Sequence, residues 1–247
     1  MTLGLFPAAP ADAGRISEIH MAAFASNVML LAQFPTPEAR EELRESIRLK
    51  ARADIEYSRI TVLVVRDIPS ESDASIIRGV DDGTCYYPAV KGVLSESQNA
   101  ESQAGKVVAL AKWSHPVAKD EEYEETPWIW PPGTNMAVLE SWGRATEEAQ
   151  EQAVGDRPCY RLTFMGTDPI YERRGAAAMM VRWGLEKCRR DNVPGYLEST
   201  LDAAPFYEKM DFAKLGPISL RYQLQDKGRN KDEVYEEIAF VFDQIPK

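Results

Sequence analysis

The chain has 247 residues, of which 44% are hydrophobic, and its formal net charge at pH 7 is −10. This length allows one large or two small domains, and the apolar share is sufficient for a hydrophobic core. Binding to nucleic acid or to an anionic membrane requires clustered Lys and Arg, so the acidic balance argues against both partners.

The cysteines and histidines do not form a metal-binding pattern. There are three cysteines, at 85, 159 and 188, and two histidines, at 20 and 115, with no zinc-like spacing. We therefore predict no metal and no disulfide framework. The first residues lack the basic segment of a signal peptide, and no apolar run reaches the roughly 20 residues that cross a bilayer. We expect a cytoplasmic protein.

The N-terminal part predicts a strand, two helices and a second strand. The strands are expected over residues 3–7 and 60–66, and the helices over 11–25 and 37–54, where apolar residues recur every three or four positions. His20 lies in the first of these helices, and we interpret it as a packing residue rather than a catalyst.

Two polar stretches interrupt the pattern, over residues 67–104 and 117–157, with an apolar strand expected over 106–113 between them. The first stretch is mostly loop-forming residues. A loop of that length in a compact domain is usually either functional or a disordered insertion. We expect it to be ordered.

The second stretch combines acidic and aromatic residues before a helix that Thr134 would cap and that would end at Ala153. Acidic and aromatic residues together suit an amine with an apolar body, through ion pairing and cation–π contact. The same aromatic residues could instead fill the core under a long loop. We place Trp128, Trp130 and Glu140 in the substrate site.

Residues 159–190 predict a strand, a tight turn and a helix. An apolar run ends at Pro169, and the following helix places apolar residues three or four positions apart along one side. Its first turn combines Arg173, Arg174 and Gly175 with three alanines, so backbone N–H groups can approach a bound group closely. A helix start of this kind binds anions.

At this point the sequence resembles the GNAT superfamily of N-acetyltransferases. The family's phosphate loop is Gln or Arg, two residues, Gly, one residue, then Gly or Ala, and residues 172–177 fit it except at Glu172. Residues 197–212 are similar to the family's strand, short helix and Tyr-Glu-Lys-x-Gly-Phe ending, with Asp211 in place of the glycine. Glu172 is costly beside a diphosphate unless it faces solvent or pairs with an arginine. Asp tolerates the left-handed backbone better than most residues.

The resemblance implies acetyl-CoA as the cofactor, bound between splayed fourth and fifth strands at residues 161–167 and 196–199. Backbone groups of the fourth strand would hold the pantetheine and the acetyl carbonyl, and the helix start would hold the diphosphate. The candidate cofactor-binding residues are Met165, Thr167, Arg173, Arg174, Gly175, Ala176, Ala177 and Thr200.

Tyr207 matches the family's tyrosine, which implies a general acid that protonates the leaving thiolate. On the residues alone, a tyrosine after Phe206 in a short helix is more often a packing residue. For the general base we consider His115, whose side chain has a suitable pKa class, and the carboxylates of Glu140 and Glu198. A chain of water molecules could replace all three.

Two further strands, over residues 217–225 and 234–242, are expected to form a terminal hairpin. We therefore predict a single N-acetyltransferase domain over 1–247. Its α/β fold would be GNAT-like, with a mixed, mostly antiparallel sheet of about seven strands flanked by helices.

The predicted function is transfer of an acetyl group from acetyl-CoA to the primary amine of a small molecule or metabolite. Two alternatives stay open. One is a catalytically inactive acyl-CoA-binding module, in which Glu172 and Asp211 are signs of decay. The other is a protein or peptide N-acetyltransferase.

Overall fold

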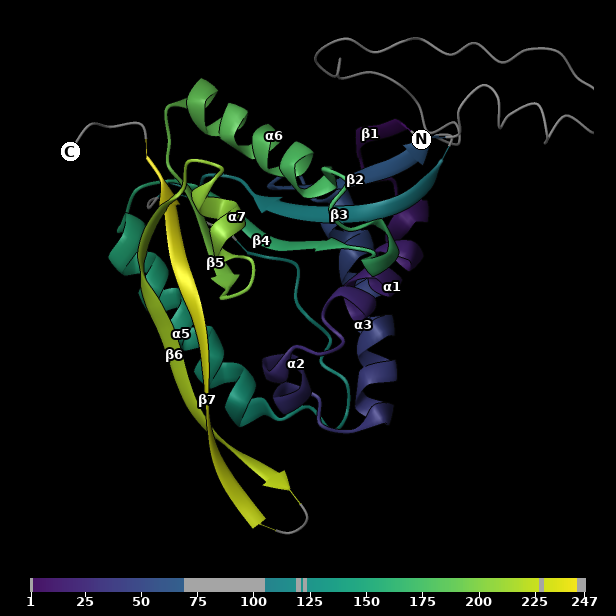
Figure 1. The fold of residues 1–247 in the computed structure, drawn as a ribbon, viewed down its shortest axis with the longest axis vertical. Coiled ribbons are helices and arrows are strands. Elements are labelled where there is room, and N and C mark those ends of the chain that lie inside the picture. The colour runs from purple at the N-terminus through teal and green to yellow at the C-terminus, as the bar shows by residue number, and fades with distance from the viewer. Residues whose placement is uncertain (1, 69–104, 119–120, 122–123, 227–228, 244–247) are drawn as a thin grey trace, which may run out of the picture.

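The structure is a computed structural model that describes residues 2–68, 105–118, 121, 124–226 and 229–243 (Figure 1). Over 224–226 and 229–231 the structure describes the backbone only. The first predicted insertion, after residue 68, lies outside the described residues up to 104. No helix in these described ranges is long and apolar enough to span a membrane.

One seven-stranded sheet organises the described part of the chain, in the order β1-β2-β3-β4-β5-β7-β6. Neighbouring strands are antiparallel except β4 and β5, which are parallel. The mostly antiparallel sheet confirms the predicted fold class. The strands are β1 (Thr2–Pro7), β2 (Ile60–Ile68), β3 (Lys106–Ser114), β4 (Tyr160–Thr167), β5 (Gly195–Thr200), β6 (Ala213–Asp226) and β7 (Arg229–Phe242).

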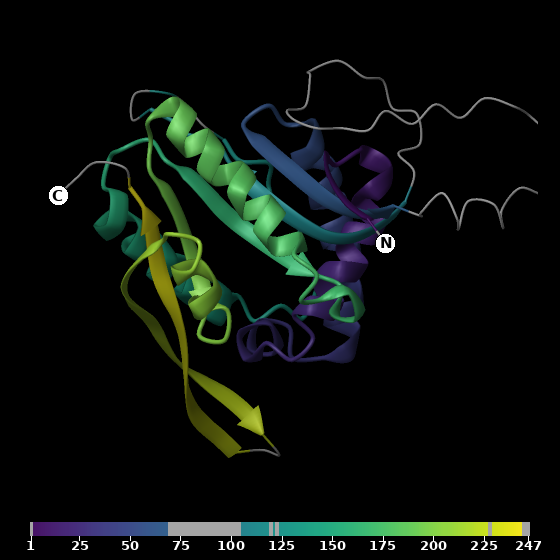
Figure 2. The same cartoon turned by 45° about the horizontal axis from the view of Figure 1, so that its top comes forward.

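Helices cover both faces of the sheet. The helices are α1 (Ala13–Ala23), α2 (Val28–Gln33), α3 (Pro37–Glu56), α5 (Met136–Val154), α6 (Ala176–Asp191) and α7 (Ala204–Glu208), with short 3₁₀ turns at Pro10–Asp12 and Pro169–Tyr171. Helices α6 and α7 lie on one face, which we call the α6 face. Helices α1 and α3 cover the other face over β2 and β3, and α5 covers it over β5 to β7 (Figures 1 and 2). We call this second face the α5 face.

The two faces have separate cores because successive residues of a strand point to opposite sides. On the α6 face, Leu197 and Phe240 pack with Val181, Leu185 and Tyr207. On the α5 face, one cluster joins β2 and β3 to α1 and α3, and another joins β5 and β7 to α5. The sheet therefore separates an α6 side from an α5 side except where its strands diverge.

Strands β4 and β5 diverge after three paired positions. Their ladder runs from Tyr160 and Gly195 to Leu162 and Leu197 and stops there. In the β3–β4 ladder Trp113 is opposite Leu162 whereas Lys112 is opposite Phe164, so Thr163 is the extra residue of a β-bulge. Beyond the bulge, the edge of β4 that faces β5 has no ladder partner among the described strands.

Two local features differ from the sequence expectation. Helix α2 was not predicted; the side chain of Asn27 caps it by accepting a hydrogen bond from the backbone N–H of Leu30 at 2.9 Å. Helix α5 begins one residue later than expected, because Asn135 rather than Thr134 is its N-cap. The Thr134 hydroxyl instead donates to the carbonyl of Pro131.

Candidate active site

The start of α6 has the backbone geometry of an anion site. Arg173 and Gly175 have positive φ angles of 62° and 94°. Gly175 is the N-cap, and no described side chain caps the helix. The first N–H groups of a helix have no partner within it, and a Cβ placed on Gly175 would meet nothing within 4 Å. Backbone donors and open space therefore coincide at the predicted phosphate loop.

The two departures from the family pattern do not obstruct this loop. Glu172 is exposed, so water screens its carboxylate. Arg174 donates to the carbonyl of Ile170 at 3.1 Å and lies 5.0 Å from the ring centroid of Tyr171. Asp211 has a φ of 66°, the left-handed conformation that the sequence pattern requires at this position.

Of the other candidate cofactor residues, Met165 and Thr167 lie on β4 beyond the bulge, where the strand has separated from β5. Thr200 is the last residue of β5 and lies across the divergence from them. Ala176 is buried and Ala177 is half-buried in the first turn of α6. The structure thus arranges the candidates along the diverging strands and the helix start.

A pocket of about 240 Å³ lies on the α5 face. Residues from α1, α2, α3, the segment before α5, α5 itself, β4 and β7 line it. Its aromatic residues include Phe34, Trp128, Trp130, Trp142, Phe164 and Tyr235. Among the described residues that line it, Glu237 is the only carboxylate and there is no Lys or Arg. The pocket can thus hold a flat apolar group beside one acidic side chain.

Trp128 and Trp130, both predicted substrate residues, lie in this pocket, whereas Glu140 does not line it. Trp128 and Trp130 stack with ring centroids 4.7 Å apart and planes 4° from parallel. Trp128 also faces Phe164, at 6.1 Å. Glu140 is exposed on α5, and Leu139 lines the pocket instead.

An ionic cluster, in which Lys50, Asp54 and Lys112 are buried and Glu125 is exposed, holds the segment before α5 against α3 and β3. The Lys112 ammonium lies 2.9 Å from Asp54 and 2.6 Å from Glu125, and Lys50 pairs with the same two carboxylates. The Thr126 hydroxyl donates to Asp54 at 2.7 Å. Burial opposes the charge of Lys112, but the carboxylates outweigh it and raise its pKa. This cluster anchors the chain directly before Trp128.

Glu237 on β7 is a site residue that the sequence analysis did not identify. The Tyr235 hydroxyl donates to its Oε1 at 2.6 Å, and the Asn27 amide donates to the Tyr235 oxygen at 3.0 Å. Burial raises the pKa of Glu237 to about 7, and the charge of Glu198 adds to this against the opposing Tyr235 hydrogen bond. The sequence could have pointed to Glu237, because alternate residues of a strand share a face and Glu237 is an acidic residue on the same face as Tyr235, Ala239 and Val241.

The predicted base candidates His115 and Glu198 lie outside the pocket lining. His115 follows β3 beside Tyr160, at the opposite end of β4 from the α6 start, with Nε2 2.8 Å from the Thr61 hydroxyl. Burial lowers its pKa. Glu198 is buried and pairs with Arg161 at 2.7 Å. Burial raises the pKa of Glu198 although Arg161 opposes this.

Tyr207 lies on the α6 face in α7, where it is 5% exposed and packs against the rings of Phe206, Phe212 and Phe240. Burial raises its pKa above the usual range, and the negative charge of Glu237 adds to the shift. The phenol is therefore protonated at neutral pH and can donate a proton. Tyr207 does not line the pocket on the α5 face, and Glu237 is near enough for its charge to affect the pKa of the phenol.

The described residues contain no group of three or more His, Cys, Asp and Glu that could hold a metal ion. Cys159 and Cys188 are free and buried, and burial raises their pKa values to about 11 and about 12. Cys85 lies outside the described residues. Neither described cysteine lines the pocket.

The comparison with protein families decides the class of this site. Residues 106–212 match the model of the acetyltransferase (GNAT) family. This stretch of the chain is a GNAT acetyltransferase domain. The matched residues include the phosphate loop and Tyr207 and end at Phe212, so Glu237 and the N-terminal wall of the pocket lie outside them.

Solved structures share the fold of this chain. A structure from Corynebacterium glutamicum, described as histone acetyltransferase HPA2 and related acetyltransferase, has a TM-score of 0.52 at 17% identity, with 100% of this chain and 99% of that chain covered. The C-terminal condensation domain of Ebony, in complex with beta-alanyl-dopamine, has a TM-score of 0.54 at 13% identity and coverages of 98% and 99%. The curated protein sequences contain no match.

Proposed function

We propose that this protein transfers the acetyl group of acetyl-CoA to the primary amine of a small molecule with a flat, apolar body. The observation that carries the acceptor class is the pocket of about 240 Å³, whose aromatic walls enclose one carboxylate. Aromatic faces attract cations and bury apolar surface, and a carboxylate attracts an ammonium group. The GNAT domain supplies the reaction class.

The residues present fit acetyl-CoA. The uncapped start of α6, with open space at Gly175, offers backbone N–H groups to the diphosphate, and Arg173 and Arg174 add positive charge. Met165 and Thr167, beyond the β-bulge, offer backbone groups to the pantetheine and the acetyl carbonyl. Bound acetyl-CoA supplies the activated thioester, and the protein positions it against the amine, which is a large source of rate acceleration.

Tyr207 would protonate the leaving thiolate. Its phenol is buried on the α6 face beside the end of β5, and its raised pKa keeps the proton on the oxygen at neutral pH. A general acid must hold its proton until the leaving group needs it. The contacts with Phe206 and Phe212 restrict the ring, so packing and proton donation are compatible roles for the same side chain.

The structure supports a small amine over the two alternatives. The two suggested signs of decay in an inactive acyl-CoA-binding module are not supported by the geometry, because Glu172 is exposed and Asp211 adopts the left-handed conformation. A peptide acceptor needs an extended groove, whereas this pocket is lined by rings from separate elements, including α2 and α5. Both observations favour an enzyme with a compact acceptor.

Thiol release from acetyl-CoA tests the proposal. The panel contains 2-phenylethylamine and tryptamine, the hydrophilic amines ethanolamine and putrescine, and a short peptide with a free N-terminus. We expect the aromatic amines to give the highest kcat/KM. Faster turnover of the peptide would favour the protein acetyltransferase, and binding of acetyl-CoA without turnover of any amine would favour the inactive module.

A further inference from the structure

Glu237 lies beside the end of β5, beyond the point where β5 diverges from β4. It is directly opposite Thr200 in the β5–β7 ladder, and Thr200 ends the strand that diverges from β4. The side chain of Glu237 lines the pocket on the α5 face, while Tyr207 approaches the same strand ends from the α6 face. The carboxylate of Glu237 is therefore next to both the acceptor pocket and the gap between β4 and β5 where acetyl-CoA is expected.

We propose that Glu237 is the general base of acetyl transfer, taking the proton that the acceptor amine loses as it attacks the thioester. The proposal rests on the proposed function, because it assigns a residue to the same reaction. The bond that forms joins the amine nitrogen to the acetyl carbon, and the bond that breaks is the carbon–sulfur bond. The bound ammonium group first loses one proton to solvent, so that the neutral amine attacks. The proton that the nitrogen loses on attack passes to Glu237, and the sulfur receives a proton from Tyr207. Exchange with solvent then restores both side chains.

The hydrogen bond that Glu237 accepts orients its carboxyl group and uses only one of the two oxygens. Tyr235 donates to Oε1, and Asn27 in turn donates to the Tyr235 oxygen, so α2 and β7 hold the carboxyl group together. No other described residue donates to this group, which leaves Oε2 for the amine. A base must lie within hydrogen-bond reach of the proton that it removes, and the pocket brings an amine to this oxygen.

The surrounding charges suit a base that works near neutral pH. The described titratable groups around Glu237 are Tyr235 on the same strand, Glu198 on β5, Tyr207 on α7 and His20 on α1. Glu198 itself pairs with Arg161. Burial and Glu198 raise the pKa of Glu237 to about 7. A catalytic base is most effective when its pKa is near the operating pH.

The other titratable groups are less suited to the role. His20 lines the same pocket, but burial lowers its pKa to about 4, and its ring lies between those of Phe24 and Phe164. Its imidazole is a weak proton acceptor and a packing group, as the sequence indicated. Glu198 pairs with Arg161 and does not line the pocket. Glu237 is thus the described carboxylate that faces the acceptor.

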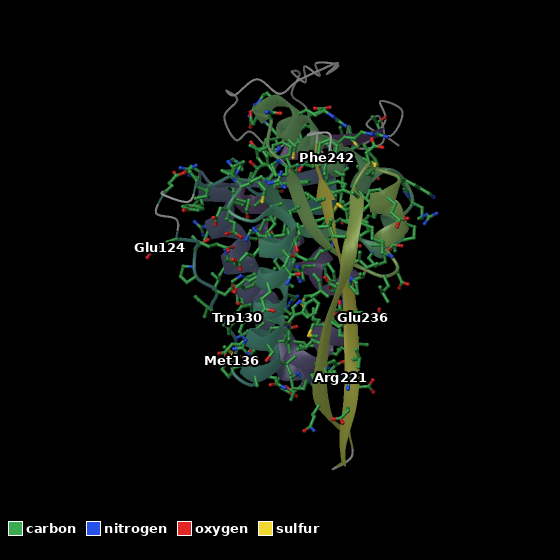
Figure 3. The ribbon with its side chains drawn as sticks, turned by 90° about the vertical axis from the view of Figure 1, so that its left-hand side faces the viewer. Glu124, Trp130, Met136, Arg221, Glu236 and Phe242 are labelled. Carbon is green, nitrogen blue, oxygen red and sulfur yellow. The ribbon has the colours of Figure 1, made fainter. Side chains whose placement is uncertain are left out.

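Glu237→Gln tests the proposal, with Glu236→Gln as the matched control. Glu236 is the exposed neighbour of Glu237 on β7 (Figure 3). Its carboxylate accepts a hydrogen bond from the Ser219 hydroxyl. With 2-phenylethylamine, we expect Glu237→Gln to lower kcat by about 10²- to 10⁴-fold and to leave acetyl-CoA affinity unchanged. The parent's kcat should fall below an apparent pKa near that of Glu237, and this dependence should vanish in Glu237→Gln. Glu236→Gln should behave as the parent.

The possible results distinguish failure of the base assignment from failure of the proposed function. A raised KM with unchanged kcat and pH profile would show that Glu237 only binds the ammonium group, which overturns the assignment of a base. Absence of turnover by the parent with every amine of the panel overturns the proposed function and the base together. An NMR titration of the Glu237 carboxyl carbon, assigned by its absence in Glu237→Gln, needs no acceptor. A midpoint near 7 supports the proposal, and one near 4.5 overturns it.

Discussion

The stacked indoles of Trp128 and Trp130, 4.7 Å apart, form one wall of the acceptor pocket. The wall begins directly after the ionic cluster in which Lys50 and Lys112 link Glu125 to Asp54 and Thr126 donates to Asp54. These contacts hold the segment before α5 against α3 and β3, so that its two indoles line the pocket.

Removal of this wall should weaken acceptor binding alone. Trp130→Ala removes an aromatic contact of about 0.5–1.5 kcal/mol, so we expect KM for 2-phenylethylamine to rise by about 2- to 10-fold with little change in kcat. Acetyl-CoA affinity, measured by calorimetry, should be retained. Trp183→Ala, on α6 outside the pocket lining, is the control. Equal losses for both substrates would indicate damage to the core instead.

Two helix glycines should respond to alanine in opposite directions. A Cβ on Gly184 of α6 would overlap the Trp113 ring of β3, whereas one on Gly143 of α5 would meet nothing within 4 Å. We expect Gly184→Ala to lower the free energy of unfolding by about 1–3 kcal/mol. Gly143→Ala should raise it by about 0.5–1 kcal/mol. Urea unfolding measures both, and equal effects would show that α6 does not pack closely on Trp113.

The titration of Glu237 should be visible in stability. Its pKa is raised from 4.5 to about 7 on folding, so the folded protein binds more protons than the unfolded one between these values. The free energy of unfolding therefore falls as pH rises from about 4.5 to about 7. Relative to the parent, Glu237→Gln should gain stability over this window, by about 3 kcal/mol at most. His20 acts in the opposite direction in both proteins, so it cancels in the difference. Parallel curves for the two proteins from pH 5 to 8 would contradict the assigned shift.

Features that depend on the local backbone were predictable from the sequence. The left-handed conformation of Asp211 follows from the glycine that the family pattern has at this position, and α6 follows from its apolar spacing. Helix α2 was missed because six residues give too short a pattern for a helical period. Thr134 and Asn135 are adjacent and both can cap a helix, and the cap is Asn135, the stronger of the two.

Features that depend on contacts between distant elements were not predictable. Glu237 lines the pocket because β7 brings it beside α1 and α2, and Asn27 and Tyr235 form a hydrogen-bonded chain with it. His115 has a suitable side chain, but the strand direction places it at the far end of β4. Residue type pointed to His115, Glu140 and Glu198 as possible bases, and none of the three lines the pocket.

Loss of the Tyr207 hydroxyl should slow the chemical step without unfolding the protein. Tyr207→Phe keeps the ring and its contacts with Phe212 and Phe240. We expect near-normal acetyl-CoA affinity and a melting temperature within a few degrees of the parent. The kcat should fall by about 10²-fold, the lower end for loss of a general acid, because thiolates leave readily. An unchanged kcat, measured where chemistry limits turnover, would assign Tyr207 to packing alone.

The most direct test of the account is mass spectrometry of the products formed from trideuteroacetyl-CoA and 2-phenylethylamine. We predict that the purified protein forms the trideuteroacetyl amide in amounts equal to the free thiol released, well above a reaction without protein. Thiol release with labelled acetate and no amide, or neither product despite saturating acetyl-CoA binding, would contradict acetyl transfer to an amine held in the pocket of Trp128, Trp130 and Glu237.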